Sequence, residues 1–215
     1  IIPDHAFYEC TSLVTVDLPD GLTTIQSYAF RGCTGLEAVT LPNSLATLEG
    51  AAFESCSNLS SVVWARSLKT TGASIFSGCT ALTGMEIPEG VTTIPAYAFY
   101  GSELTSVSLP TTLTTIGSNA FRGCTGLTAV TLPEGTVKIG DSAFRGCTGL
   151  TTVTLPATLT TIGGEAFRDC TGLTAMTLPN SVTSMEYGAF QDCANLAAIN
   201  YPTGWTSAGT GIFTG

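Results

Sequence analysis

The sequence predicts an α/β solenoid, a stack of about nine to ten coils of 23 residues that share one continuous core. The first observation behind this prediction is the position of the phenylalanines, which number ten in the 215-residue chain. Each ends an Ala-Phe pair or a close variant, and successive ones are 23 residues apart except for one interval of 22. They are Phe7, Phe30, Phe53, Phe76, Phe99, Phe121, Phe144, Phe167, Phe190 and Phe213.

The second observation is a repeated apolar pattern that precedes each phenylalanine. In the unit that starts at Leu150, the pattern Leu-x-x-Val-x-Leu is followed by Pro156, and eight of the ten prolines of the chain occupy this position. Because one unit cannot bury its apolar edge alone, identical units are expected to stack and turn each apolar position into a ladder along the axis.

Three elements are expected in each coil. Residues 150–155 alternate apolar and polar side chains, which predicts a strand with Val153 and Leu155 inward. Proline ends this strand because it has no N–H to donate. Residues 159–162 are rich in β-branched side chains and predict a second short extended segment. Phe167 and Cys170 are three residues apart, which favours a helical or 3₁₀ turn on the convex side, with the parallel sheet on the concave face.

Two units depart from the pattern. Residues 64–71 read Trp-Ala-Arg-Ser-Leu-Lys-Thr-Thr where other units have Leu-Pro and Ile-Gly. Residues 100–104 have lost one residue and the cysteine, and we expect this deletion to tighten one turn without breaking the stack.

The composition excludes several classes of function. Hydrophobic residues make up 44% of the chain and charged residues 11%, with a net charge of −9. Without a basic patch, nucleic acid is not an expected partner. No stretch approaches the roughly 20 apolar residues of a membrane span, so membrane insertion is not expected either.

The consensus L-x-x-V-x-L-P followed by L-x-x-I-G-x-x-A-F-x-x-C resembles the BspA-like (Treponema-type) leucine-rich repeat, and the resemblance covers essentially the whole chain. It implies a leucine-rich-repeat fold and a secreted or surface-attached protein, several members of the family being thought to act as adhesins. We interpret residues 1–215 as one domain and as part of a longer chain, because the sequence starts within a repeat and without Met.

The eight cysteines all follow a repeat phenylalanine by three residues. This position predicts an inward ladder of small apolar thiols, with one or two disulfide bridges as the alternative. Metal binding is disfavoured because the chain has no CxxC pair. The ladder consists of Cys10, Cys33, Cys56, Cys79, Cys124, Cys147, Cys170 and Cys193.

No catalytic constellation or cofactor-binding motif is visible, so an enzyme is not predicted. The one histidine, His5, is interpreted as a solvated turn residue. Arg31, Arg122, Arg145 and Arg168 all follow a repeat phenylalanine, and we expect Asp141, Glu165 and Asp169 to compensate their charge. An anionic contact surface is the alternative for this row.

The candidate binding surface is one outward column on the strands. Its members are Asp17, Thr40, Val63, Glu86, Ser108, Thr131, Thr154, Thr177 and Asn200. The column lacks the Trp, Tyr and Arg that are typical of protein-binding hot spots, so it also fits an ordinary hydrated sheet surface with no specific partner. Its Thr and Asn side chains would suit a glycan. Asn58 begins the one N-glycosylation sequon.

Two functions follow from these observations. The first is a non-catalytic scaffold outside or on the surface of the cell, which recognises an unknown protein or glycan in the manner of an adhesin. The alternative is a structural solenoid that stacks end to end with further copies of itself into a filament or sheath, because uncapped coils expose strand edges.

Overall fold

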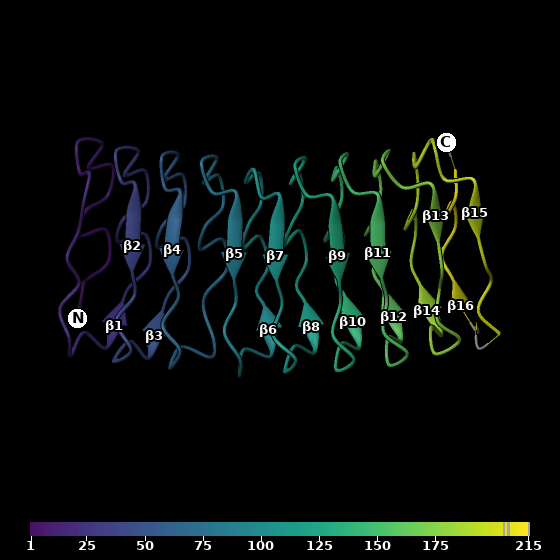
Figure 1. The fold of residues 1–215 in the computed structure, drawn as a ribbon, viewed down its shortest axis with the longest axis horizontal. Coiled ribbons are helices and arrows are strands. Elements are labelled where there is room, and N and C mark those ends of the chain that lie inside the picture. The colour runs from purple at the N-terminus through teal and green to yellow at the C-terminus, as the bar shows by residue number, and fades with distance from the viewer. Residues whose placement is uncertain (204, 206, 215) are drawn as a thin grey trace.

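The computed structural model describes residues 1–203, 205 and 207–214, and shows a stack of coils with two rows of short strands along it (Figure 1). One row, the first arc, follows the Leu-x-x-Val-x-Leu pattern. Its strands are β2 (Ala38–Thr40), β4 (Ser61–Val63), β5 (Gly84–Glu86), β7 (Ser106–Ser108), β9 (Ala129–Thr131), β11 (Thr152–Thr154), β13 (Ala175–Met176) and β15 (Ala198–Ile199).

The other row, the second arc, confirms the second extended segment. Its strands are β1 (Thr24–Ile25), β3 (Thr47–Leu48), β6 (Thr93–Ile94), β8 (Thr115–Ile116), β10 (Lys138–Ile139), β12 (Thr161–Ile162), β14 (Ser184–Met185) and β16 (Ser207–Ala208). The described residues thus form about eight turns that carry a strand, fewer than the nine to ten coils expected. The count is lower because the first coil, around Val16, forms no strand.

The two rows differ in how their strands pair. On the second arc, β6 to β16 form one continuous six-stranded parallel sheet. The first arc, expected to carry a single sheet on a concave face, is instead split into two-stranded pairs: β2 with β4, β5 with β7, β9 with β11 and β13 with β15. The paired spacing of the first-arc strands can be followed in Figure 1. Every second junction of the first arc therefore lacks a hydrogen-bonded ladder.

The core lies between the two arcs and follows the predicted columns. Val130 and Leu132 are buried while Ala129 and Thr131 between and beside them are exposed, as strand alternation requires. The ten phenylalanines form one stack with ring centroids 4.9–6.0 Å apart and interplanar angles of 1–18°. Each fully buried ring contributes about 1.5–3 kcal/mol to folding.

The predicted helical turn is wrong, and no described residue lies in a helix. The cause is the backbone at two places in each turn, two residues before and two residues after the phenylalanine. Around Phe167, these are Glu165 with φ 55° and Asp169 with φ 61°, both in the left-handed region that an α-helix cannot contain. The spacing of Phe167 and Cys170 is the same in either geometry, so the sequence pattern did not distinguish them.

Alternate residues of this turn bond in different directions. The N–H of Arg168 donates to the carbonyl of Glu165 within the turn, whereas the N–H of Phe167 donates to the carbonyl of Ala189 in the next coil, 2.8 Å away. The same alternation recurs in the other turns. The turns are therefore hydrogen-bonded into a ladder of their own, which satisfies backbone groups that would otherwise be buried without partners.

The deletion near residue 102 leaves the stack intact, as expected. Phe99 and Phe121 are 22 residues apart in sequence and still stack at 5.4 Å. Ser102 occupies the place of the missing cysteine, is fully buried, and donates its hydroxyl to the carbonyl of Phe99 at 2.9 Å. A buried hydroxyl is tolerated there because it has this acceptor.

Candidate functional site

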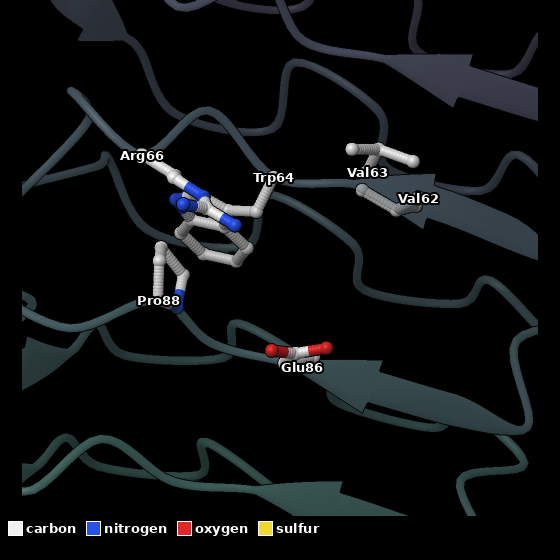
Figure 2. A pocket seen from close by; sticks show the side chains of 6 residues that line it. All are labelled: Val62, Val63, Trp64, Arg66, Glu86 and Pro88. Carbon is white, nitrogen blue, oxygen red and sulfur yellow. The ribbon is translucent and has the colours of Figure 1, made fainter.

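The junction between β4 and β5 forms a groove of about 200 Å³ on the first-arc face. No strand ladder joins β4 to β5. Figure 2 shows Val62 and Val63 on β4 and Glu86 on the neighbouring β5, with a second group of side chains beyond the ends of the strands. That second group is Trp64, Arg66 and Pro88.

Trp64 shapes this groove because it replaces the leucine that ends the strand in other units. Its indole is 7% exposed, packs edge-on against Phe76 with centroids 5.9 Å apart, and donates Nε1–H to the carbonyl of Leu68 at 3.4 Å. The ring separation in the phenylalanine stack widens from 5.1 Å between Phe30 and Phe53 to 6.0 Å between Phe76 and Phe99. The indole thus lies where the phenylalanine stack is wider than at Phe30 and Phe53.

Two cations lie beside the groove. The Arg66 side chain is exposed, and no carboxylate of the described residues lies within ion-pair distance of its guanidinium. Lys69 is held in place, because its ammonium donates to the carbonyls of Arg66 and Glu89. Arg66 therefore presents an unpaired guanidinium with several N–H donors, while its backbone carbonyl is held by Lys69. A guanidinium of this kind recognises a carboxylate or a set of hydroxyls.

The acids near the groove do not neutralise Arg66. The Glu89 carboxylate accepts the backbone N–H and the hydroxyl of Thr111, both at 3.0 Å, and these bonds lower its pKa. Glu86 is exposed on the opposite strand. The groove thus combines an apolar wall, a free guanidinium and an exposed carboxylate.

The rest of the predicted strand-face column is exposed, but it is not one continuous surface. Thr40 lies opposite Val63, Glu86 opposite Ser108, and Thr131 opposite Thr154. Two other hollows lie at unpaired junctions, one beside Asp17 and Thr40 and one beside Ser108 and Thr131. Val63 is the one large apolar member and is 54% exposed.

Asn200, another member of the column, is used within the fold. Its Oδ1 accepts the N–H of Leu178 at 2.6 Å, and its Nδ2 donates to the carbonyl of Leu178 at 2.8 Å. The side chain amide thereby extends the ladder between β13 and β15. Its polar atoms are already engaged, so Asn200 is a poor candidate for ligand contact.

The arginine row is partly compensated. Arg145 pairs with Glu165 at 2.5 Å, and Arg168 pairs with Glu165 at 2.7 Å and with Asp192 at 3.3 Å. Asp169 lies 3.6 Å from both arginines, which confirms two of the three predicted acids. Asp141 instead accepts the N–H of Gly164.

The turn face, the surface around the repeat phenylalanines, also carries exposed tyrosines that sequence reasoning missed. Tyr28 and Tyr97 precede a phenylalanine by two residues and have φ 58°, at a position that is glycine in two other coils and another residue with positive φ in the rest. A left-handed conformation costs a non-glycine residue about 1–2 kcal/mol. Both rings are nevertheless exposed, at 37% and 42%. The signal was the Tyr-Ala-Phe triplet, which occurs at 28–30 and 97–99.

The comparisons with known proteins agree with this geometry. The family described as the BspA type leucine rich repeat region, in six copies, matches residues 1–127 and 92–215, which together span the whole chain. The chain belongs to this family. Its repeats are those of a binding scaffold, and proteins of this family and fold are generally non-catalytic. No curated protein matches the chain.

Solved structures support the same leucine-rich-repeat fold. A leucine-rich repeat protein from Bacteroides ovatus is 23% identical with a TM-score of 0.61, over 99% of this chain and 73% of its own. The leucine-rich repeat protein of T. pallidum is 28% identical with a TM-score of 0.59, over 86% of this chain and 77% of its own. The pneumococcal vaccine antigen PcpA is 20% identical with a TM-score of 0.53, over 89% of this chain and 55% of its own.

The cysteines of this BspA-type solenoid are free thiols, seven of them buried and Cys10 exposed. Each buried thiol donates to the carbonyl of the phenylalanine in the preceding coil, as Cys147 does to Phe121 at 3.1 Å. Burial raises the pKa of every buried thiol, to about 11 for Cys33, Cys124 and Cys193. A protonated thiol is a poor nucleophile, so this column has a packing role.

The thiols give a direct test of this arrangement. In the native BspA-type chain, a water-soluble aromatic disulfide reagent at pH 8 should modify one cysteine rapidly, since Cys10 alone is exposed. The remaining seven should react only after denaturation. A Cys10→Ser variant should lose the rapid phase, and a rapid phase that persists in this variant would contradict the buried ladder.

The remaining candidate residues have simple surroundings. His5 lies 2.9 Å from Asp4, and its ring is tilted against Tyr8 and Tyr28 with centroids 5.1 and 4.9 Å away, so it is part of a surface cluster. Asn58 is exposed, as an acceptor of a glycan must be. Within the described part of the chain, no group of His, Cys, Asp or Glu is arranged to hold a metal ion, and no helix is long and apolar enough to cross a bilayer.

Proposed function

We propose that the chain is a recognition scaffold that works outside the cell or on its surface and holds a protein or glycan partner at the groove between β4 and β5. The observation that carries this proposal is the Arg66 guanidinium, exposed beside Trp64 with no carboxylate of the described residues in ion-pair distance. Arginine is enriched at the centres of binding surfaces, and the buried Trp64 supports the groove from within. The family resemblance supports the extracellular setting and an adhesin-like role.

The groove also lies at one of the first-arc junctions where adjacent strands are not hydrogen-bonded to each other. In a solenoid, backbone groups between adjacent strands are normally joined, and a gap leaves them available to a ligand. Val63 adds an apolar surface where the neighbouring strand has Thr40. The groove would therefore offer a partner the positive charge of Arg66, the apolar surface of Val63 and the backbone hydrogen-bonding groups that no neighbouring strand uses.

Arrays of extracellular-matrix proteins and of glycans test this function. We expect the wild-type chain to bind at least one member, and Arg66→Ala to weaken that binding tenfold or more, the loss typical of a central contact. Val63→Thr, which copies the residue at Thr40, should weaken it less. The matched control is Lys138→Ala, which removes an exposed cation from the second arc.

Two results would overturn the proposal. One is binding that Arg66→Ala leaves unchanged, which would place the contact elsewhere. The other is a mass that grows with concentration in light scattering, together with an absence of partners, which would favour the end-to-end filament. A constant mass near 22.1 kDa is the expected result.

A further inference from the structure

We propose that the turn face carries a second site, separate from the groove between β4 and β5, which binds a linear, uncharged polysaccharide. The site is a trough of about 300 Å³ across four consecutive coils. It is lined by Tyr100, Arg122, Arg145 and Asp169 together with Gly101, Gly123 and Gly146.

The glycines keep this trough open. They stand two residues after successive phenylalanines, with φ of 65°, 75° and 72°. Packing does not require them, because a Cβ on Gly101 would meet nothing within 4 Å and one on Gly123 or Gly146 would meet atoms no closer than 3.8 Å. Other coils place Glu9, Ser55, Asp169 and Asp192 at this position with similar φ. Glycine also occurs at this position at Gly32 and Gly78, so the unbroken run from Gly78 to Gly146 leaves a bare floor, although other coils show that a side chain can be accommodated there.

The side chains beside the floor suit the face of a sugar. The Tyr100 ring is 38% exposed, with Tyr97 beside it at a centroid distance of 5.7 Å. The guanidinium of Arg122 lies 5.7 Å from the Tyr100 centroid, and its Nη1 donates to Asn119 Oδ1 at 3.2 Å. An aromatic face packs against the C–H groups of a sugar ring, while the remaining guanidinium N–H groups can donate to its hydroxyls.

A second tyrosine–arginine contact occurs on the turn face, in a coil where Glu9 stands in place of Gly101. Tyr8 and Arg31 occupy the positions of Tyr100 and Arg122 four coils away, and the Arg31 guanidinium lies 5.8 Å from the Tyr8 centroid. Tyr28 also contacts Arg31, at 5.6 Å. At about 5 Å for each coil, the two arrangements are about 20 Å apart along one line. Two tyrosine–arginine contacts in line fit a ligand whose own units repeat, which a polysaccharide chain provides.

Charge decides which polysaccharide fits. The chain has a net charge of −9. Beside the two tyrosine–arginine contacts, Arg31 pairs with Glu54 at 3.0 Å and Arg145 with Glu165, so these cations are already neutralised. For a polyanion, long-range repulsion from the net negative charge of the chain would weaken binding more than attraction to Arg122 would strengthen it. The ligand class is therefore uncharged.

The test measures binding of linear β-glucan, mannan and galactan by affinity electrophoresis, with dextran sulfate as the charged comparison. We expect at least one uncharged polymer to bind, and Tyr100→Ala and Arg122→Ala to weaken it tenfold or more. Gly123→Asn should also abolish binding while the melting temperature stays near that of the wild type, because asparagine tolerates positive φ and has room at this position. Arg66→Ala is the control and should leave this binding unchanged, whatever its effect at the first groove.

The second contact has its own readout. Tyr8→Ala should weaken binding of the long polymer but not of a short oligosaccharide, since only the polymer reaches both arrangements. Preference for dextran sulfate, or binding of an uncharged polymer that neither Gly123→Asn nor Tyr100→Ala changes, would overturn the site. An equal effect of Tyr8→Ala on the polymer and the oligosaccharide would overturn the two-contact arrangement.

Discussion

Replacement of Phe144 by alanine should lower the free energy of unfolding by about 3–5 kcal/mol. The ring is fully buried and lies between Phe121 at 5.3 Å and Phe167 at 5.4 Å, nearly parallel to both. The cavity cannot collapse easily, because hydrogen bonds between successive turns fix the backbone on both sides. Urea denaturation followed by circular dichroism would measure the loss.

A solenoid gives this substitution a second consequence. Each coil contacts its immediate neighbours, so a weakened interface in the middle reduces the coupling of the two halves. We expect the variant to unfold over a broader range of urea or in two steps. Phe7→Ala is the matched control, since Phe7 is 36% exposed and its loss should cost much less. Equal losses for the two variants would contradict the stacked core as the main source of stability.

The second large effect is alkaline unfolding driven by the cysteine ladder. Burial raises the pKa of all seven buried thiols above 9, to about 11 for Cys33 and about 12 for Cys56. The folded state therefore keeps its protons over a range of pH in which the unfolded chain releases them. The stability linked to each thiol is complete below about pH 9 and is lost as the pH rises toward the folded pKa.

The size of this effect comes from the number of thiols. Each one lowers the free energy of unfolding by about 1.4 kcal/mol for every pH unit between the unfolded and the folded pKa. Because seven act together, we expect cooperative unfolding between about pH 9 and 11, measured by circular dichroism. In a Cys147→Ser, Cys170→Ser variant the dependence on pH should be shallower, whatever its starting stability. A slope that the variant shares with the wild type would refute the ladder as the cause.

Much of the fold could be predicted from the sequence because its information is periodic. The columns of Phe144, Val130 and Leu132 occupy the core as expected, and the extended segments lie where β-branched residues occur. The turn was mispredicted because Glu165 and Asp169 adopt left-handed backbone without being glycine. Their conformation is imposed by hydrogen bonds to the next coil, which no single unit reveals.

The candidate site was less predictable because it also depends on contacts between coils, which the sequence of one unit does not contain. The exposed column could be read from strand alternation, but whether β4 pairs with β5 depends on contacts between coils. Trp64 and Arg66 marked an unusual unit without showing that a groove lies beside them. The tyrosines of the turn face lay outside the strand pattern, and their proximity to arginines two dozen residues away emerges only after stacking.

The unequal pairing of the two arcs has a mechanical consequence. From β6 to β16 the continuous six-stranded sheet resists stretching, since extension there would break a hydrogen-bonded ladder at every coil. The first arc can lengthen at its unpaired junctions without breaking any ladder. We therefore expect the part of the rod from β6 to β16 to be stiffer along the second arc than along the first, which lacks a strand ladder at every second junction. A ligand that wedges into one junction would bend the whole rod, and traction on the rod would in turn change how tightly that junction holds its ligand.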